Sequence, residues 1–281
     1  MELNTKTASV LLALVISARA TSFMFSKICL TTMTAFSLIS VRFILASLIM
    51  LILFHKHIFN RFNKKDMLKG FLFGTLYFYT LLCEHIGLKT TNSGTASLLE
   101  NMAIIIVPLA EAILSRKYPS NKVLLRALMS VCGIALMSLK DQTVSFSSGE
   151  LYLLCAALFY SSAIIVTNRL TADGDTFNMG FFQVCTIALW GTVSAALSGR
   201  YTLPVSTGQY AMVFLLAAVC TCFGFTLQPV AQSRITSDKA ALFCAINPFI
   251  ASILGIVFLH ENFTVFTVSG EIMIFVALIL R

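Results

Sequence analysis

Charged side chains inside long apolar runs are the residues of this sequence best suited to chemistry. Arg19 and Arg42 interrupt the first two runs, Glu84 the third and Glu100 the fourth. An ionised side chain in hydrocarbon costs roughly 2.5 to 3.5 kcal/mol, so each of these needs a partner or a water-filled cavity. A buried carboxylate can take up a proton or hold a cationic group, and a guanidinium can hold an anionic group. The four residues are therefore the first candidates for a solute site.

Helical spacing brings further polar residues to the same faces. Asn101 adjoins Glu100, and Tyr77 precedes Glu84 by seven residues, which is close to two helical turns. Polar side chains on a spanning helix face protein or water rather than lipid. We predict that the substrate path is lined by Arg19, Arg42, Tyr77, Glu84, Glu100, Asn101, Gln228 and Asn247.

Small residues and prolines mark other features of the same runs. Gly70 and Gly74 share a face with the third-run carboxylate, and we expect that face to be wet. Ala251 and Gly255 belong to a small-residue stripe in the ninth run, which favours close helix packing. Pro108 lies inside the fourth run and frees a backbone carbonyl there.

The charges also allow a purely structural interpretation. An ion pair between Arg42 and Glu84 or Glu100 would hold helices together without contacting a solute. Lys27 and Glu271 lie near the ends of their runs, where a long side chain can extend to the membrane surface.

The composition places the elements that carry these residues in a bilayer. Of 281 residues, 58% are hydrophobic and only 11% are charged, which leaves too little polar surface for a soluble domain. Apolar runs of roughly 17 to 22 residues, long enough to cross the hydrocarbon, recur along the whole chain. We predict an all-α integral membrane protein with ten transmembrane helices at about Ala8–Cys29, Thr34–Phe54, Leu68–Leu88, Gly94–Leu114, Val123–Leu139, Leu151–Asn168, Met179–Ser198, Ala211–Val230, Ala240–His260 and Thr264–Leu280.

The basic residues indicate topology rather than nucleic-acid binding. The formal net charge is +8, but Lys and Arg concentrate at the ends of the runs and form no basic arm. Most of them fall in segments that are cytoplasmic if both termini are cytoplasmic, as the positive-inside rule requires. We therefore predict a multi-pass protein of the inner membrane with both termini inside.

The two halves of the chain share one pattern. A shift of 144 positions lays Ser237–Leu280 on Ser93–Leu136, and both segments consist of two apolar runs joined by a polar link. We predict two repeats, residues 1–140 and 141–281, with five helices each. Because five is odd, the second repeat enters the membrane inverted. Inverted repeats place their substrate site near the midplane between the halves.

Enzymatic motifs are missing from the sequence. There is no HExxH, no Walker loop and no glycine-rich dinucleotide turn, and the eight cysteines form no CxxC pair. His55 and His57 form an HxH in a basic link without a matching ligand set. We expect no enzymatic activity, no metal and no cofactor.

Several motifs together resemble a known family. They are VRFILASL at Val41–Leu48, GELYLLCAALFYSSAIIVTNRL from Gly149, and LHE at Leu259–Glu261 after a mid-helix Pro248, followed by Gly270. The chain resembles the EamA-type permeases of the drug/metabolite transporter superfamily. It departs from them at Arg19, where the family has a tryptophan. The resemblance implies an inner-membrane exporter of small metabolites, often amino acids, with a central cavity between two repeats.

The function predicted from the sequence is secondary active transport. We expect a monomeric or homodimeric exporter of a small-molecule substrate such as an amino acid, working by alternating access, with intramembrane carboxylates that would allow proton coupling. Two alternatives are a passive facilitator or channel for small solutes and a membrane assembly protein that transports nothing.

Overall fold

The protein is almost entirely helical in the part of the chain that its structure, a computed structural model, describes. That part comprises residues 5–116, 118–137, 139–140, 143–144, 147–170, 174–224, 237–262 and 264–280. Its helices are α1 Thr5–Cys29, α2 Ala35–Asn60, α3 Lys64–Leu88, α4 Ser93–Asn101, α5 Ala103–Leu114, α6 Asn121–Met137, α7 Ser148–Leu170, α8 Thr176–Leu197, α9 Thr207–Leu215, η1 Leu216–Phe223, α11 Ser237–Leu259 and α12 Val265–Ile279.

Each of the ten predicted spans overlaps a helix, and residues 225–230 of the eighth lie outside the described part of the chain. Within the described residues, six helices are long and apolar enough to cross a membrane, namely α1, α2, α3, the α4–α5 pair, α7 and α8. The α9–η1 pair, α11 and α12 contain shorter apolar helices. The chain is therefore an all-α, multi-pass membrane protein.

Between α6 and α7 lies a short hairpin rather than a long linker. Strand β1 (Leu139–Lys140) pairs antiparallel with β2 (Thr143–Val144). This hairpin stands where the two matching halves of the sequence meet.

Several spans depart from a regular α-helix, among them α2, which is kinked at Phe54. The fourth is interrupted at Met102, between α4 and α5. Pro108 itself lies inside α5, where it removes one backbone donor. The eighth span continues from α9 into a π-helix of eight residues, η1. Such π-helical turns are rare and are often found at functional sites.

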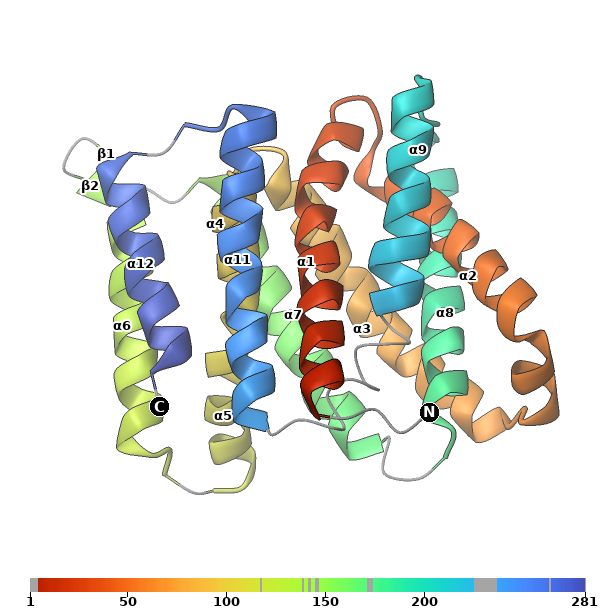
Figure 1. Ribbon diagram of the computed structural model, residues 1–281, viewed down its shortest axis with the longest axis horizontal. Helices are drawn as coiled ribbons and strands as arrows, with labels where there is room; N and C mark the ends of the chain where they lie inside the picture. The colour runs from red at the N-terminus through yellow and green to blue at the C-terminus, as the bar shows by residue number, and fades with distance from the viewer. Residues whose placement is uncertain are drawn as a thin grey trace.

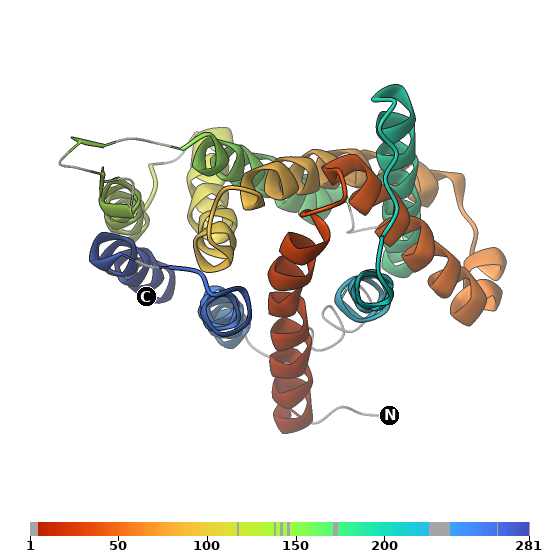
Figure 2. The same cartoon turned by 90° about the horizontal axis from the view of Figure 1, so that it is seen from above.

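The helices pack in pairs that join the two halves of the chain. α2 packs on α8, α4 on α11 and α6 on α12. In addition, α1 packs on α11 and η1, while α7 packs on α3, α4 and α5. Figures 1 and 2 show α12, α11, α1 and α9 in a layer in front of α6, α5, α7, α3 and α8. α1 begins and α12 ends at the same end of the bundle, the lower one in Figure 1.

The interior contains two apolar clusters. One draws residues from most of the helices and contains Leu88 of α3, Leu99 of α4 and Ala251 of α11. The other is built mainly from α2 and α8 and contains Phe43 and Val184. The two clusters are distinct packing units. α2 and the eighth span contribute different buried residues to each of them.

The glycines of α3 serve packing, which corrects the prediction of a wet face. A Cβ on Gly70 or Gly74 would come within 2.7 Å of backbone oxygens of α8, so no larger residue fits between these helices. Close approach through small residues is a usual way to join helices in lipid. Gln183 of α8, 5% exposed, is buried in the same contact. The wet part of α3 therefore begins beyond Gly74.

Polar side chains fix the ends of the helices. Thr34 caps α2, and Asp175 caps α8 by accepting hydrogen bonds from the backbone amides of Phe177 and Asn178. Asp175 also pairs with His57 at 2.9 Å, which ties the end of α2 to the start of α8. These caps satisfy amides that would otherwise lack partners.

Candidate functional site

A cavity of about 100 Å³ lies among helices of both halves of the chain. Its lining comes from α1, α2, α3, α4, α7, η1 and α11. The lining residues are Ile16, Arg19, Ser22, Phe23, Arg42, Phe43, Tyr77, Thr80, Leu81, Glu84, Glu100, Asn101, Tyr160, Cys220 and Asn247. Pockets for drug-sized ligands occupy about 300 to 1,000 Å³, so this one matches a much smaller solute.

The structure brings seven of the eight predicted substrate-path residues to this cavity. They are Arg19, Arg42, Tyr77, Glu84, Glu100, Asn101 and Asn247. The eighth, Gln228, lies outside the described residues. Whether these residues contact a substrate remains a prediction, but they do share one space.

Arg42 is fixed by hydroxyl groups. Its Nε donates to Thr221 Oγ1 at 3.0 Å and its Nη1 donates to Ser22 Oγ at 3.2 Å. The side chain is 5% exposed, and its Cζ lies 5.3 Å from the centroid of the Phe43 ring. Because these hydrogen bonds go to neutral groups, they leave the charge of the guanidinium unneutralised at short range. The geometry does not support the interpretation that Arg42 only pairs with a carboxylate to hold helices together.

The two acidic groups of the cavity lie together. The carboxyl groups of Glu84 and Glu100 are within hydrogen-bonding reach of each other, with Arg42 and Arg19 as the nearby cations. A hydrogen bond between two carboxyl groups exists only when one of them carries a proton. Glu84 is 5% exposed, so water does not screen the pair strongly. The arrangement therefore places two buried carboxyl groups and two guanidinium groups around one cavity.

Some polar atoms of the cavity lack partners. Glu100 Oε2 and Asn247 Oδ1 are buried and accept no hydrogen bond from the described residues. A buried acceptor without a donor costs about 1 to 3 kcal/mol, and native proteins keep few of them. Both oxygens belong to cavity-lining residues, so a bound solute or ordered water could satisfy them.

Aromatic rings form one wall of the cavity. The rings of Tyr77 and Tyr160 meet edge to face with centroids 5.8 Å apart. Tyr79, in contrast, points away from the cavity and stacks on Phe159 at 5.4 Å, which is a packing role. This wall offers an aromatic surface beside the Arg and Glu side chains of the cavity.

The π-helix shapes the opposite wall. Thr221 donates to the carbonyl oxygen of Leu216, five residues earlier, at 2.9 Å and accepts from Arg42. Cys220 donates to the carbonyl oxygen of Ala18 on α1 at 3.2 Å. The wider turn of η1 thus connects α1 and α2 through adjacent side chains.

The candidate list from the sequence did not include several lining residues. Ser22, Thr80, Tyr160 and Cys220 all face the cavity. Small hydroxyl and thiol groups occur throughout apolar helices, where they bond to their own backbone, so residue type alone does not single them out. Position was a signal for Ser22 and Thr80, which lie one turn from Arg19 and Glu84, and the aromatic ring was a signal for Tyr160.

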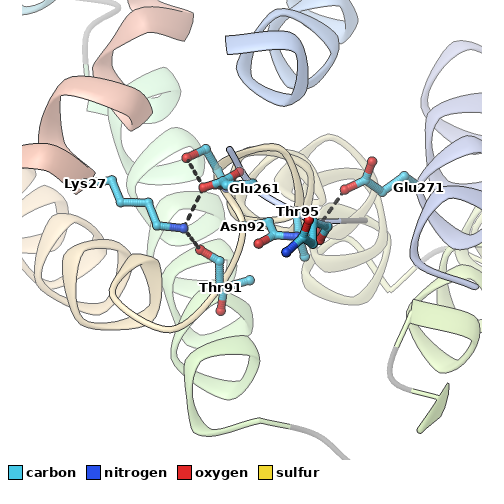
Figure 3. A network of polar contacts seen from close by, with 8 residues as sticks. Lys27, Thr91, Asn92, Thr95, Glu261 and Glu271 are labelled. Carbon is cyan, nitrogen blue, oxygen red and sulfur yellow. Dashed lines mark hydrogen bonds and ion pairs between the residues drawn. The ribbon is translucent and has the colours of Figure 1, made fainter. Parts of the chain in front are cut away.

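A second polar network, the Lys27 clasp, lies away from the cavity at the end of the bundle where α1 finishes (Figure 3). We define it as Lys27, Thr91, Ser93 and Glu261. Lys27 Nζ donates to Glu261 Oε1 at 2.6 Å and to the carbonyl oxygen of Thr91 at 2.7 Å. The backbone amide of Ser93 donates to both carboxylate oxygens of Glu261, at 3.0 and 2.8 Å, and its hydroxyl donates at 2.9 Å. Lys27 is thus paired and does not extend to the membrane surface.

Glu261 acts as the cap that α4 lacks locally. Asn92 occupies the N-cap position of α4 but makes no capping hydrogen bond with its side chain. Instead, its amide donates to the carbonyl oxygen of Asn262 at 2.9 Å. A carboxylate at a helix N-terminus satisfies free amides and is attracted by the helix dipole. The second half of the chain therefore completes a helix of the first half.

Within the described residues, no group of three or more His, Cys, Asp or Glu side chains could hold a metal ion.

The comparison with protein-family models identifies one family. The sequence model of the EamA-like transporter family matches residues 6–139 and again residues 147–281. Two proteins of Archaeoglobus fulgidus, each named an uncharacterized transporter, are similar over most of their length. One is 26% identical over 96% of this chain and 95% of its own, and the other is 22% identical over 96% and 83%. One solved crystal structure has a TM-score of 0.68 at 16% identity, covering 98% of this chain and 96% of its own, and it supports the fold alone.

The two matches together span nearly the whole sequence, and the helices that carry them form a membrane-spanning bundle. This chain belongs to the EamA-like transporter family.

Proposed function

We propose that the chain is a secondary active transporter that exports small polar metabolites, such as amino acids or related compounds, by alternating access. The observation that carries the proposal is a small cavity with two guanidinium and two carboxyl groups, lined by helices from both halves of the chain. Intramembrane charges that face a cavity are typical of substrate and ion pathways. The family and the transporter relatives support the general class.

The halves are proposed to be two inverted repeats, residues 1–140 and 141–281. The helix packing is nearly symmetric between the halves, because several contacts are formed by helices at equivalent positions of the two repeats. α2 with α8, α4 with α11 and α6 with α12 are pairs of counterparts, and α1 on α11 corresponds to α7 on α4 and α5. Counterparts α6 and α12 run in opposite directions in Figure 1, as inversion requires. The twofold family match supports the same division.

The charges of the cavity fit a zwitterionic solute. The guanidinium of Arg42 would hold a carboxylate, and the Glu84–Glu100 pair would hold an ammonium group, beside the rings of Tyr77 and Tyr160. The cavity offers both signs of charge within a space too small for a drug-sized molecule. Amino acids and close analogues have this combination of size and charge.

Proton exchange follows from competition at the carboxyl pair. When the pair holds its proton, the two Arg and two Glu side chains carry a net charge of +1, and loss of the proton brings that charge to zero. An ammonium group binds more favourably after the proton has left. The substrate and the proton would then occupy the same site in turn, and each would cross the membrane in the opposite direction. This is proton-coupled antiport.

The orientation completes the proposal. The chain would lie in the inner membrane with both termini in the cytoplasm, as the distribution of Lys and Arg favours. The even number of spans supports both termini on one side.

The test is flux in proteoliposomes made from purified protein. A panel of labelled amino acids and small metabolites is assayed with and without an imposed pH gradient, and Glu84→Gln and Glu100→Gln are run beside the parent. The proposal expects flux that follows the gradient in the parent and loses that dependence in at least one variant. Flux that ignores both the gradient and the substitutions would indicate a facilitator, and no flux of any solute would favour an assembly protein.

A further inference from the structure

The Lys27 clasp connects the ends of three helices that line the cavity, α1, α4 and α11. Lys27 follows Ser22 of the cavity by five residues on α1, and Ser93 precedes Glu100 by seven residues on α4. At 1.5 Å per residue, the clasp lies about 7 to 10 Å along the helix axes from the cavity. Both helices, and the end of α11, meet at the upper end of the bundle in Figure 1. The clasp therefore lies between the cavity and one face of the membrane.

Most partners of the clasp belong to one tightly packed unit. A Cβ on Gly94 would come 1.8 Å from Ser252 Oγ, so α4 and α11 touch almost backbone to backbone. Thr95 of α4 donates to Glu271 of α12 at 2.8 Å. Figure 3 shows this second contact beside the clasp. At this end, the close contact between α4 and α11 leaves little room for relative movement, and a hydrogen bond links α4 to α12.

Glu261 is held inside this unit by geometry as well as by hydrogen bonds. Its backbone amide donates to the carbonyl oxygen of Gly255 at 3.1 Å, and a Cβ on Gly255 would come within 2.2 Å of Glu261 Oε2. His260, just before it, has a positive φ of 52°, which turns the chain back onto α11. The carboxylate therefore stays with α4 and α11 whatever its other partners do.

Lys27 alone reaches the clasp from α1. Its side chain is 23% exposed, whereas that of Glu261 is 5% exposed. α1 touches α4 much less than it touches α11, so the ammonium group bridges a thinly packed seam between α1 and α4. Separation along this seam breaks two hydrogen bonds of Lys27 and none of the three that Ser93 donates to Glu261.

We infer that the Lys27 clasp is a gate between the cavity and the face of the membrane where α1 ends. It is closed in this structure, and it opens when Lys27 leaves Glu261 and Thr91 while Glu261 remains on the N-terminus of α4. The inference rests on the proposed alternating access. The cost of opening stays moderate because Glu261 keeps its amide and hydroxyl donors, so no buried carboxylate is left without partners.

The test is the labelling of Cys220, which lines the cavity and is 4% exposed. A variant that retains Cys220 as its only cysteine is treated in membrane vesicles with a membrane-impermeant maleimide from one face at a time. Thr31→Cys, at the exposed end of α1, is labelled separately to mark the face concerned. We expect Lys27→Met to raise the labelling rate of Cys220 at least about tenfold from that face and to leave labelling from the other face unchanged or reduced. Lys27→Arg keeps the charge and should label slowly.

Unchanged labelling of a folded Lys27→Met variant from the marked face would overturn the inference. If that variant is lost from the membrane, Glu261→Gln decides the question, because it removes the charge that Lys27 pairs with and keeps an oxygen that can accept from Ser93. Faster labelling of Glu261→Gln from the marked face supports a gate, and the parental rate opposes it. Labelling of Cys220 does not require flux. If labelling responds to the substitutions but the protein transports no solute, the proposed transport is rejected and the gate is retained.

Discussion

The cavity and the Lys27 clasp both contain buried charges, but their hydrogen bonding differs. In the clasp, the carboxylate of Glu261 accepts from an ammonium, an amide and a hydroxyl. In the cavity, Glu100 Oε2 and Asn247 Oδ1 accept nothing from the described residues, and Arg42 donates hydrogen bonds to the neutral hydroxyls of Ser22 and Thr221.

This difference separates groups whose hydrogen bonds hold helices together from groups that a bound solute could satisfy. A satisfied buried charge stabilises a particular arrangement, and removing one partner is expensive because the other is left buried. An unsatisfied group is a cost to the folded state that a ligand can recover. Substitutions in the cavity should therefore reduce transport more than stability, and substitutions at the clasp should do the opposite.

The largest effect is expected from Arg42→Gln. Charge-assisted hydrogen bonds contribute about 1.5 to 3 kcal/mol, and 1.4 kcal/mol is a factor of ten, so flux at low substrate concentration should fall about 100-fold. The thermal midpoint in detergent should stay close to that of the parent. Arg42→Lys keeps the charge but lacks the planar guanidinium group with its two parallel donors. Flux at low substrate concentration should therefore fall about tenfold. A large drop in midpoint with normal flux would place Arg42 with the structural charges instead.

Asn247→Leu should give a smaller loss of flux together with a gain in stability. Removing a buried oxygen without a partner relieves a cost of about 1 to 3 kcal/mol, so the thermal midpoint should not fall. Flux at low substrate concentration should drop about tenfold because the solute loses one donor or acceptor contact. Scintillation counting of proteoliposomes and differential scanning fluorimetry measure the two quantities on one preparation. A fall in both together would contradict the comparison.

Gly255→Ala should act mainly on stability. The new Cβ would meet Glu261 Oε2, and overpacking of this kind costs about 1 to 3 kcal/mol. We expect a lower thermal midpoint and a loss of flux of only a few-fold. Gly180→Ala is the matched control, since a Cβ there meets nothing within 4 Å and alanine favours a helix. Equal midpoints for the two variants would show that the fit around Glu261 is loose.

The smallest effect is expected from Glu271→Gln. The amide oxygen can still accept the hydrogen bond from Thr95, so the link between α12 and α4 is kept. Flux and thermal midpoint should stay within about twofold and about 2 °C of the parent, the latter corresponding to about 1 kcal/mol. A loss as large as that of Glu84→Gln would extend the solute path to α12.

Much of the fold and of the cavity follows from local patterns. Apolar runs of spanning length predict helices because backbone groups in lipid must bond within their own segment. The lining role of Tyr77 and Glu84 follows from the helical period, which places residues seven apart on one face. Periodicity failed at Gly70 and Gly74, which occupy the same face but meet α8 before the cavity begins.

Contacts between distant segments could not be predicted in this way. Lys27 and Glu261 are 234 residues apart, and no spacing rule connects them. Each looks like an ordinary charge at a helix end, and their pairing depends on how α1, α4 and α11 converge. The π-helix at Cys220 and Thr221 was equally hidden, because it depends on packing against α1 and α2 rather than on residue type.

The cap that Glu261 provides has a consequence for biosynthesis. The carboxylate that accepts from Ser93 is 168 residues later in the chain. α4 therefore enters the membrane long before its N-terminus can be capped. At about 5 to 20 residues per second, that delay is roughly 8 to 34 seconds of translation. A first half made alone would keep an unfinished helix end and be a target for proteolysis. Two halves expressed together from separate genes would be expected to protect each other.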